Sequence, residues 1–228
     1  MPAIAKNPGL LYVVATPIGN YGDITLRAIE VLRSVKAVIC EEYKEGSILM
    51  KKLGIDPVEL IVLNEHNEME RSGELITRLW QGQSLALISD CGTPTFSDPG
   101  SSLISQAVQA GIRVTPVPGP SSLMAALSIL DTPPERFFFA GFLPRETQQR
   151  VRELTKLRDT KITLILMDTP YRMTGLLTDI EKIFGPRQNC TLATDLTLPG
   201  ERIYRGSVKE ILAVAAGRKA EFILIIHR

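Results

Sequence analysis

Three loops rich in glycine and proline follow short apolar runs of this sequence, and their residues are suited to binding a small ligand. They are Thr16–Asp23, Ser89–Gly100 and Pro116–Ser122. Glycine lets the backbone approach a ligand closely and present its N–H and C=O groups to it. If the apolar runs are strands of one parallel sheet, their carboxyl ends meet at one edge. A single loop of this kind is an ordinary turn, but three at one edge favour a binding site.

The usual fingerprints of nucleotide binding are incomplete or absent. The first loop offers only Gly19 and Gly22, with Pro17 where a dinucleotide would need backbone N–H groups, although Glu41 stands at about the spacing of a ribose-binding acid. No Gly-Lys-Ser or Gly-Lys-Thr triplet occurs, which excludes a P-loop. A Gly-x-Ser-x-Gly elbow is also missing, which argues against a Ser-His-Asp hydrolase.

The catalytic residue is unknown from the sequence, and three carboxylates are candidates. Glu41 and Glu42 follow the second strand, where a carboxylate could orient an acceptor or serve as a general base, or else form a solvated pair. Asp23 is the third candidate, although an acid before a helix also fits the helix dipole. Cys91 has no histidine partner nearby in the pattern, so we interpret it as a small apolar filler and not a nucleophile.

Strands alternate with helices in the first half of the chain, which predicts crossovers and a mainly parallel sheet. Thr25 is a plausible N-cap of the first helix. The predicted strands are Leu10–Ala15, Ala37–Cys40, Leu60–Leu63, Leu85–Ser89 and Arg113–Val117. The predicted helices are Ile24–Ser34, Ser47–Leu53, Met69–Gln81 and Ser101–Ala110.

The second half has more consecutive strands and fewer helices, which predicts a mixed sheet. Its strands are Phe137–Ala140, Ile162–Met167, Thr191–Thr194, Arg202–Tyr204 and Phe222–His227, and its helices are Ser121–Ile129, Thr147–Arg158 and Arg172–Phe184. A proline-rich hinge near Val117–Gly119 separates the halves. We therefore predict an α/β fold of two α/β domains: an N-terminal domain, 8–117, and a C-terminal α+β domain, 118–228.

Composition excludes several classes of protein. Of 228 residues, 44% are hydrophobic and the formal net charge is +1, so intrinsic disorder is excluded and no polyanion partner is indicated. Three dispersed cysteines and two histidines predict neither disulfides nor a metal site. No apolar run approaches a membrane span or a signal sequence. We expect a cytoplasmic protein without a membrane or metal partner.

Four ordered segments resemble the tetrapyrrole methylase family, and within it the branch that modifies small-subunit ribosomal RNA. They are residues 11–32, 87–100, 114–128 and 137–145. The resemblance implies two α/β domains with a cleft between them that binds S-adenosylmethionine (AdoMet), in a homodimer. The N-terminal domain would supply the acceptor side and part of the cofactor site, and the C-terminal domain the adenosine side. The family's cofactor positions match Pro17, Gly19, Asp90, Cys91, Gly92, Thr93, Ser97, Asp98, Ser121, Ser122, Met167, Asp168, Ala193, Thr194, Gly206 and Ser207.

The sequence does not decide between three classes of methyl acceptor: RNA, a small molecule, or none. The branch resembled implies a ribose 2′-hydroxyl of small-subunit ribosomal RNA, and hence a role in rRNA processing. Departures from the branch, such as Tyr43-Lys44 after Glu42 and Thr169–Arg172 in place of Ser-Pro-His-Arg, keep two alternatives open. These are a small-molecule acceptor such as a tetrapyrrole precursor, and an AdoMet-binding module without acceptor chemistry.

Three surface features bear on partners. The polar segment Asn64–Glu68 could form a substrate lid, although a histidine such as His66 in a polar loop is usually a surface residue. The basic residues Arg145, Arg150, Arg152, Lys156, Arg158 and Lys161 could contact RNA, but interspersed acids favour a solvated helix face. The run Phe137–Phe139 would be exposed on a monomer and favours association into a dimer.

Overall fold

The computed structural model describes residues 7–56, 58–95 and 98–228, and the chain divides into two compact units, Met1–Ser121 and Ser122–Arg228. The loop after residue 117 packs within unit 1, because a Cβ placed on Gly119 would lie 3.1 Å from Ala15 Cβ. The Thr93 hydroxyl also donates to the Pro120 carbonyl (3.4 Å). The hinge expected near Val117–Gly119 stays a prediction.

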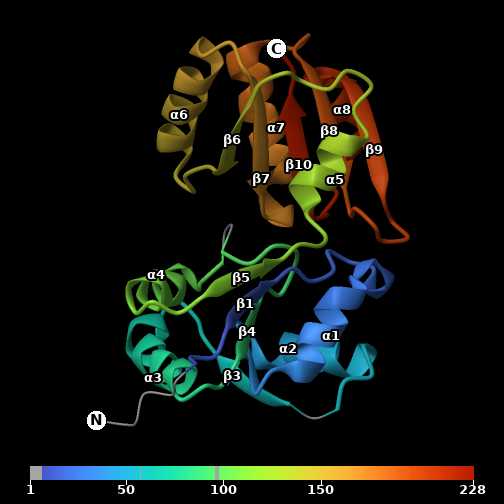
Figure 1. The fold of residues 1–228 in the computed structure, drawn as a ribbon. Helices are drawn as coiled ribbons and strands as arrows, with labels where there is room; N and C mark the ends of the chain where they lie inside the picture. The colour runs from blue at the N-terminus through green and yellow to red at the C-terminus, as the bar shows by residue number, and fades with distance from the viewer. Residues whose placement is uncertain (1–6, 57, 96–97) are drawn as a thin grey trace. The chain divides into compact units, whose positions relative to one another are not determined.

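Unit 1 is a parallel sheet covered on both faces, as predicted (Figure 1). Its strands β1 (Leu11–Val14), β2 (Ala37–Cys40), β3 (Glu59–Val62), β4 (Leu85–Ile88) and β5 (Val114–Val117) are arranged in the order β3-β2-β4-β1-β5. Every paired strand runs parallel to its neighbour. All residues of β2 and β4 are buried, as expected for strands that helices cover on both sides.

Two pairs of helices cover this sheet. One face is packed by α1 (Leu26–Ser34) and α2 (Tyr43–Lys52), and the other by α3 (Glu68–Trp80) and α4 (Ser101–Gln109). The Thr25 side chain caps α1 as predicted, by accepting from the Ala28 N–H. The second helix begins at Tyr43, before its predicted start at Ser47, because its N-cap Glu42 makes no side-chain capping bond that would mark the start in the sequence.

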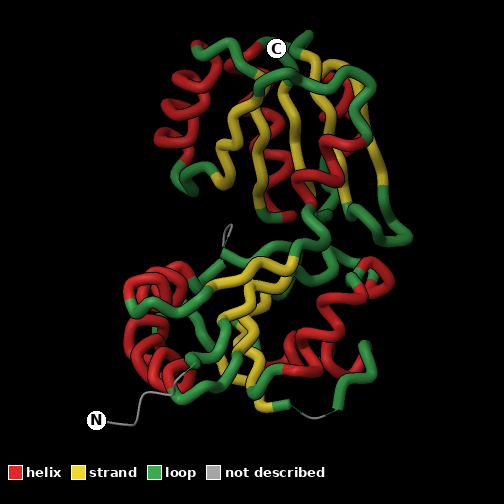
Figure 2. Tube along the Cα trace, in the orientation of Figure 1, coloured by secondary structure: helices red, strands yellow, loops and turns green. Residues whose placement is uncertain are grey.

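Unit 2 contains the mixed sheet that the sequence predicts. Its strands are β6 (Phe137–Phe142), β7 (Thr163–Asp168), β8 (Asn189–Thr194), β9 (Arg202–Ser207) and β10 (Phe222–Ile226), in the order β6-β7-β10-β8-β9. Only β6 and β7 pair in parallel, and the other pairs are antiparallel. Figure 2 shows the strands of this sheet side by side, with helices before and behind them.

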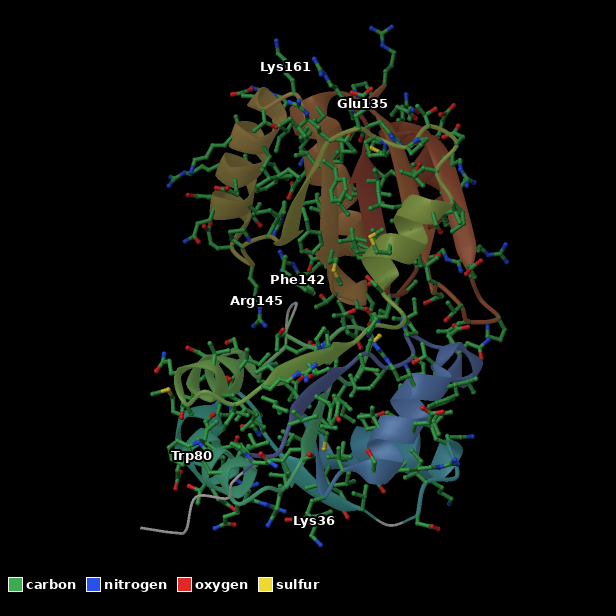
Figure 3. All side chains as sticks on the ribbon, viewed as in Figure 1. Lys36, Trp80, Glu135, Phe142, Arg145 and Lys161 are labelled. Carbon is green, nitrogen blue, oxygen red and sulfur yellow. The ribbon has the colours of Figure 1, made fainter. Side chains whose placement is uncertain are left out.

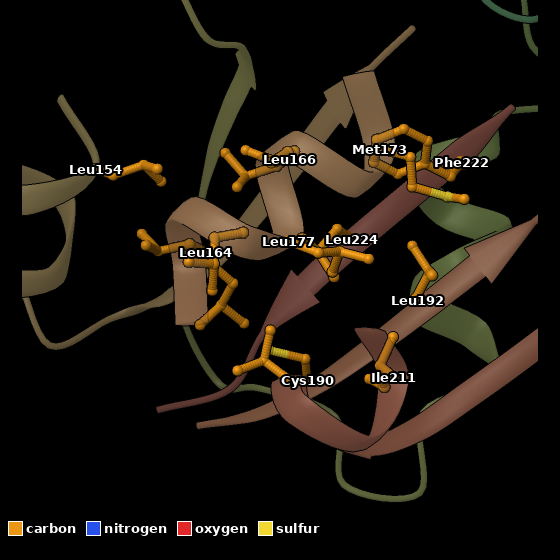
Figure 4. Packing of buried hydrophobic residues seen from close by; sticks show 14 of the residues in the cluster. Leu154, Leu164, Leu166, Met173, Leu177, Cys190, Leu192, Ile211, Phe222 and Leu224 are labelled. Carbon is orange, nitrogen blue, oxygen red and sulfur yellow. The ribbon is translucent and has the colours of Figure 1, made fainter. Parts of the chain in front are cut away.

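The core of unit 2 lies mainly between the sheet and three helices. These are α6 (Thr147–Asp159), α7 (Met173–Phe184) and α8 (Val208–Ala215), whereas α5 (Ser122–Ser128) packs on the opposite face. Figure 4 shows Leu177 and Leu224 meeting inside this core, and both side chains are fully buried. The sequence analysis missed α8. Its signal was present, because Ser207 and Glu210 form a reciprocal capping box.

The basic helix α6 differs from the predicted solvated face at one position. Arg150 is buried and forms an ion pair with Asp179 of α7, with 2.7 Å between Nη2 and Oδ2. Its guanidinium also donates to the Arg145 carbonyl (3.0 Å). The assignment of Arg150 to a surface patch was therefore wrong, because its charge is used inside unit 2. In the described part of the chain, no helix is both long and apolar enough to cross a membrane.

Candidate functional site

The three glycine- and proline-rich loops of unit 1 meet at the carboxyl ends of adjacent strands, as predicted. Thr16, directly after β1, donates its backbone N–H to the Gly92 carbonyl (2.9 Å) and its hydroxyl to the Ser89 carbonyl (2.9 Å). The bond from Thr93 to Pro120 joins the loop after β4 to the loop after β5. Strand order explains the convergence, because β1 lies between β4 and β5.

The loop after β4 is held in shape by one of the predicted site residues. Asp98 Oδ2 accepts a hydrogen bond from the Ser89 hydroxyl (2.5 Å), and the Ser89 oxygen accepts the Cys91 N–H (3.0 Å). Asp98 therefore positions the loop that carries Asp90 and Cys91. Ser97, another predicted site residue, lies outside the described residues.

A cavity of about 160 Å³ opens between the loops after β1 and β4 and helix α2. Four of the predicted cofactor residues line it: Pro17, Gly19, Asp90 and Cys91. Tyr21 and Glu45 also line it, and the sequence analysis missed both. Glu45 was missed because the residues of α2 before Ser47 were not recognised as helical, although three acids within five positions, 41, 42 and 45, were a usable signal.

Gly92 makes close packing of this loop possible. Its φ is +83°, and a Cβ there would lie 3.2 Å from Ile18 Cγ2. Thr93 is exposed and held to Pro120, which places it at the rim of the same loops. Ser121 is the last residue of unit 1, and Ser122 is the first residue of α5 in unit 2.

The edge of the sheet that carries the cavity is strongly acidic. Burial raises the pKa of Glu41, and the nearby charges of Asp90, Asp98, Glu42 and Glu65 raise it further. Burial likewise raises the pKa of Asp90, an effect that the Glu42 backbone N–H opposes and that Glu45, Glu42 and Asp98 reinforce. Burial, Asp90 and Glu42 raise the pKa of Cys40 to about 11. This edge favours a cation and repels phosphate.

We expect Asp90→Asn to stabilise the ligand-free protein near neutral pH. The folded protein binds the Asp90 proton more tightly than the unfolded chain, because the pKa of the carboxyl is raised on folding. The charged carboxylate thus lowers stability once the pH exceeds the unfolded pKa, and the full penalty is present above the folded pKa. Thermal unfolding should show a higher Tm for the variant at pH 7 and no difference at a pH below both values. A lower Tm at pH 7 would contradict a destabilising effect of the partly buried Asp90 charge.

None of the three catalytic candidates, Glu41, Glu42 and Asp23, is among the residues that line the cavity. Glu42 is exposed at the start of α2, and Asp23 is exposed at the end of a 3-10 helix, Tyr21–Asp23. Asp23 precedes the Thr25 cap of α1, which agrees with its interpretation as a helix-terminal acid.

The polar segment 64–68 has a structural role. Asn64 Oδ1 accepts the His66 N–H, and Glu68 Oε1 accepts the backbone N–H groups of Gly100 (2.9 Å) and Ser102 (2.8 Å). Helix α4 makes no side-chain capping bond at its own N-cap, Gly100, so Glu68 of α3 caps it from outside. The loop after β4 is thereby attached to α3.

In unit 2, four predicted residues lie in two adjacent rows across the sheet. Phe222 of β10 pairs with Asp168 and Thr194, and Ile223 pairs with Met167 and Ala193. The structure does not bring Gly206 and Ser207 to these rows. They pair with the opposite end of β8, at Cys190 and Asn189, because β9 runs antiparallel to β8. Gly206 and Ser207 instead form the start of α8.

Asp168 is the most unusual of these residues. Its Oδ1 accepts the Thr169 N–H (2.7 Å) and pairs with Arg172 (3.2 Å), while its buried Oδ2 has no hydrogen-bond partner among the described residues. Burial raises the pKa of the Asp168 carboxyl, against the lowering effects of the Thr169 N–H and of Arg172 and Arg150. Among the residues described, no cluster of three His, Cys, Asp or Glu side chains could hold a metal ion.

The profile of the family described as "Tetrapyrrole (Corrin/Porphyrin) Methylases" matches residues 10–212. A relative from Xylella fastidiosa (strain Temecula1) named "Ribosomal RNA small subunit methyltransferase I" is 43% identical over 226 residues, covering 97% of this chain and 82% of the relative. A protein of the same name from Escherichia coli O157:H7 is 39% identical over 226 residues, covering 97% of this chain and 79% of that protein.

Solved structures share the fold at low sequence identity. Uroporphyrin-III-C-methyltransferase from Thermus thermophilus superposes with a TM-score of 0.65 at 22% identity, covering 96% of this chain and 94% of that enzyme. Diphthine synthase superposes with a TM-score of 0.71 at 15% identity, covering 96% of this chain and 89% of that chain. At these identities the likeness establishes the α/β fold alone.

Proposed function

Because this chain belongs to the tetrapyrrole (corrin/porphyrin) methylase family, as its motifs predicted, and is therefore a methyltransferase, we propose that it transfers the methyl group of AdoMet to small-subunit ribosomal RNA. We take the acceptor from the relatives at 43% and 39% identity, whose names specify small-subunit ribosomal RNA. The observation that carries the donor assignment is the acidic, glycine-lined cavity of unit 1.

The residues of the cavity fit one end of AdoMet. Its sulfonium is a cation, which suits an edge where Glu41, Glu45 and Asp90 lie together and where a phosphate group would be repelled. The positive φ of Gly92 lets the loop that carries the lining residues Asp90 and Cys91 pack closely against Ile18. A volume of about 160 Å³ is below the roughly 300 Å³ of a complete small-molecule pocket, so we assign the cavity to the methionine end.

The donor supplies an activated methyl group, and the chain's own residues would hold the acceptor and take up its proton. Within the proposal, the acceptor is a ribose 2′-hydroxyl, which is a very weak acid and must lose its proton during or after transfer. Glu41 is our candidate base, since its raised pKa makes it a better proton acceptor than an ordinary glutamate. Met167, Asp168, Ala193 and Thr194 are our candidates for adenosine contacts, because they lie in two adjacent rows of the unit 2 sheet.

The homodimer is supported by an exposed apolar edge. Phe137 and Phe138 of β6 are 42% and 49% exposed, and β6 is an edge strand of its sheet. An exposed aromatic edge strand favours association with another copy. Light scattering should give twice the chain mass of 25.1 kDa. A ribosomal substrate would also place the protein in the cytoplasm.

Isothermal calorimetry tests the donor assignment. Purified protein should release or absorb heat with AdoMet and with its product S-adenosylhomocysteine, and should give no signal with NADH or ATP. The reason is that the acidic cavity accepts a sulfonium or zwitterion but repels di- and triphosphates. Binding of NADH without binding of S-adenosylhomocysteine would overturn the assignment.

A further inference from the structure

Two aromatic side chains lie in solvent at the carboxyl ends of β6 and β7. Phe142 ends β6 and is 48% exposed, and its register partner in β7 is Met167. Tyr171 lies in the 3-10 helix Pro170–Arg172 that follows β7 and is 79% exposed. Since both strands run in the same direction, the two aromatic residues belong to the same end of the sheet.

Two cations accompany these aromatic rings. Lys219 Nζ lies 4.9 Å from the centre of the Tyr171 ring. Arg145 follows Phe142 in the loop before α6, and Figure 3 shows its side chain projecting beyond the end of that loop. Within the described part of the chain, neither Arg145 nor Lys219 forms a salt bridge. We call Phe142, Arg145, Tyr171 and Lys219 the aromatic–basic patch.

Two arginines, Arg150 and Arg172, hold the backbone under this patch. Arg172 Nη2 donates to the carbonyls of Leu143 (3.1 Å) and Pro144 (2.8 Å), while its Nη1 pairs with Asp168. Arg150 donates to the Arg145 carbonyl (3.0 Å). The loop after β6 and the segment after β7 are thus joined by bonds inside unit 2, so the aromatic–basic patch is presented on an ordered backbone.

The charge of the chain is divided unequally between its units. Unit 1 has 10 Lys and Arg against 13 Asp and Glu, a formal charge of −3, whereas unit 2 has 16 against 12, a formal charge of +4. The overall charge of +1 conceals this separation. A polyanion is therefore repelled by unit 1 and attracted by unit 2, which carries the aromatic–basic patch.

We propose that the aromatic–basic patch binds single-stranded RNA of the acceptor, an inference that rests on the proposed function. Tyr171 stacks on a base, since it is largely exposed and every base has a π-face. Lys219 and Arg145 contact neighbouring phosphates, because neither side chain forms a salt bridge among the described residues. An aromatic ring with a cation beside it matches the alternating base and phosphate of a single strand.

The test uses full-length protein and a fluorescent single-stranded RNA read by anisotropy, together with methylation of isolated small ribosomal subunits. Tyr171→Ala should weaken RNA binding about tenfold, whereas Tyr171→Phe should stay within about twofold because the ring is kept. Lys219→Gln should reduce the slope of log K against log salt by about one. The matched control is Lys182→Gln, which removes an exposed cation from the far end of α7 and should change neither quantity.

Steady-state kinetics separate the patch from the methyl-transfer site. Tyr171→Ala should raise KM for the RNA substrate about tenfold, with kcat and the affinity for S-adenosylhomocysteine unchanged. Unchanged RNA binding and KM in Tyr171→Ala would overturn the proposal. If Tyr171→Ala raised KM for small ribosomal subunits but bound free RNA normally, the patch would contact a ribosomal protein. That result would also overturn the proposal. Wild-type protein that binds RNA through the patch but methylates none would instead refute the proposed function.

Discussion

Replacing Gly92 with valine will abolish measurable binding of the methyl donor while leaving the protein folded. Gly92 has a φ of +83°, where a β-branched residue is strongly disfavoured. Its new Cβ would also lie 3.2 Å from Ile18 Cγ2 and 3.8 Å from the Pro120 carbonyl oxygen. Relief of these contacts must shift the loops that surround the cavity. We expect at least about a hundredfold loss of S-adenosylhomocysteine affinity by calorimetry, which corresponds to about 2.7 kcal/mol.

Gly111→Val is the matched control for this prediction. Gly111 has a similar φ of +71°, but nothing lies within 4 Å of the Cβ position. Both variants therefore introduce backbone strain, of the order of 1–2 kcal/mol, and only Gly92→Val also disturbs the cavity. Donor binding should be normal in Gly111→Val. Equal losses in the two variants would indicate a general loss of stability, and normal binding by Gly92→Val would exclude the loop from the site.

Removing the Asp179 carboxylate should produce the largest loss of stability. Asp179 pairs with Arg150 at 2.7 Å, and the two side chains are only 9% and 10% exposed. Asp179→Ala leaves the Arg150 guanidinium buried without its anion, which typically costs about 3–5 kcal/mol. Urea denaturation followed by circular dichroism should show this decrease in the free energy of unfolding.

Two further variants test the cause of that loss. Asp159→Ala removes the anion of an exposed pair with Arg158, whose side chains are 64% and 45% exposed, and should cost no more than about 1 kcal/mol. The double variant Arg150→Met with Asp179→Leu removes both buried charges and should recover most of the stability. If the double variant is as unstable as Asp179→Ala, the loss arises from packing and not from the unpaired charge.

The sequence predicted the fold class and the convergence of the three loops because both depend on local patterns. Continuous apolar runs such as Ala37–Cys40 predict strands buried on both faces. All four residues of Ala37–Cys40 are buried in the structure. Helix α8 was missed because it starts directly after β9. Between Arg202 and Ala215 the spacing of apolar residues changes from that of a strand to that of a helix, and no loop separates the two.

Long-range contacts account for what the sequence could not predict. The burial of Arg150 depends on Asp179, 29 positions away, and nothing local to α6 distinguishes Arg150 from the exposed Arg152. The capping of α4 by Glu68 likewise depends on a partner 32 or more positions distant. The aromatic–basic patch joins residues between 142 and 219, so no sequence window contains it.

The separation of Gly206 and Ser207 from the row of Met167 and Ala193 has the same origin. Resemblance to a family motif matches residues one position at a time and carries no information on strand direction. The antiparallel direction of β9 decides which end of the sheet each of its residues occupies. Glu45 joins the cavity through the position of α2 against the sheet, which also required the structure.

Transfer of a labelled methyl group tests the central claim most directly. Purified protein and AdoMet labelled in its methyl group are incubated separately with assembled small ribosomal subunits, free ribosomal RNA and tetrapyrrole precursors. Nuclease digestion and mass spectrometry then locate the label. We expect one methyl group on a ribose of the RNA from assembled subunits and none on the tetrapyrroles. Label on the tetrapyrroles alone would contradict the RNA assignment, and label on no acceptor despite bound donor would contradict the claim of an active RNA methyltransferase.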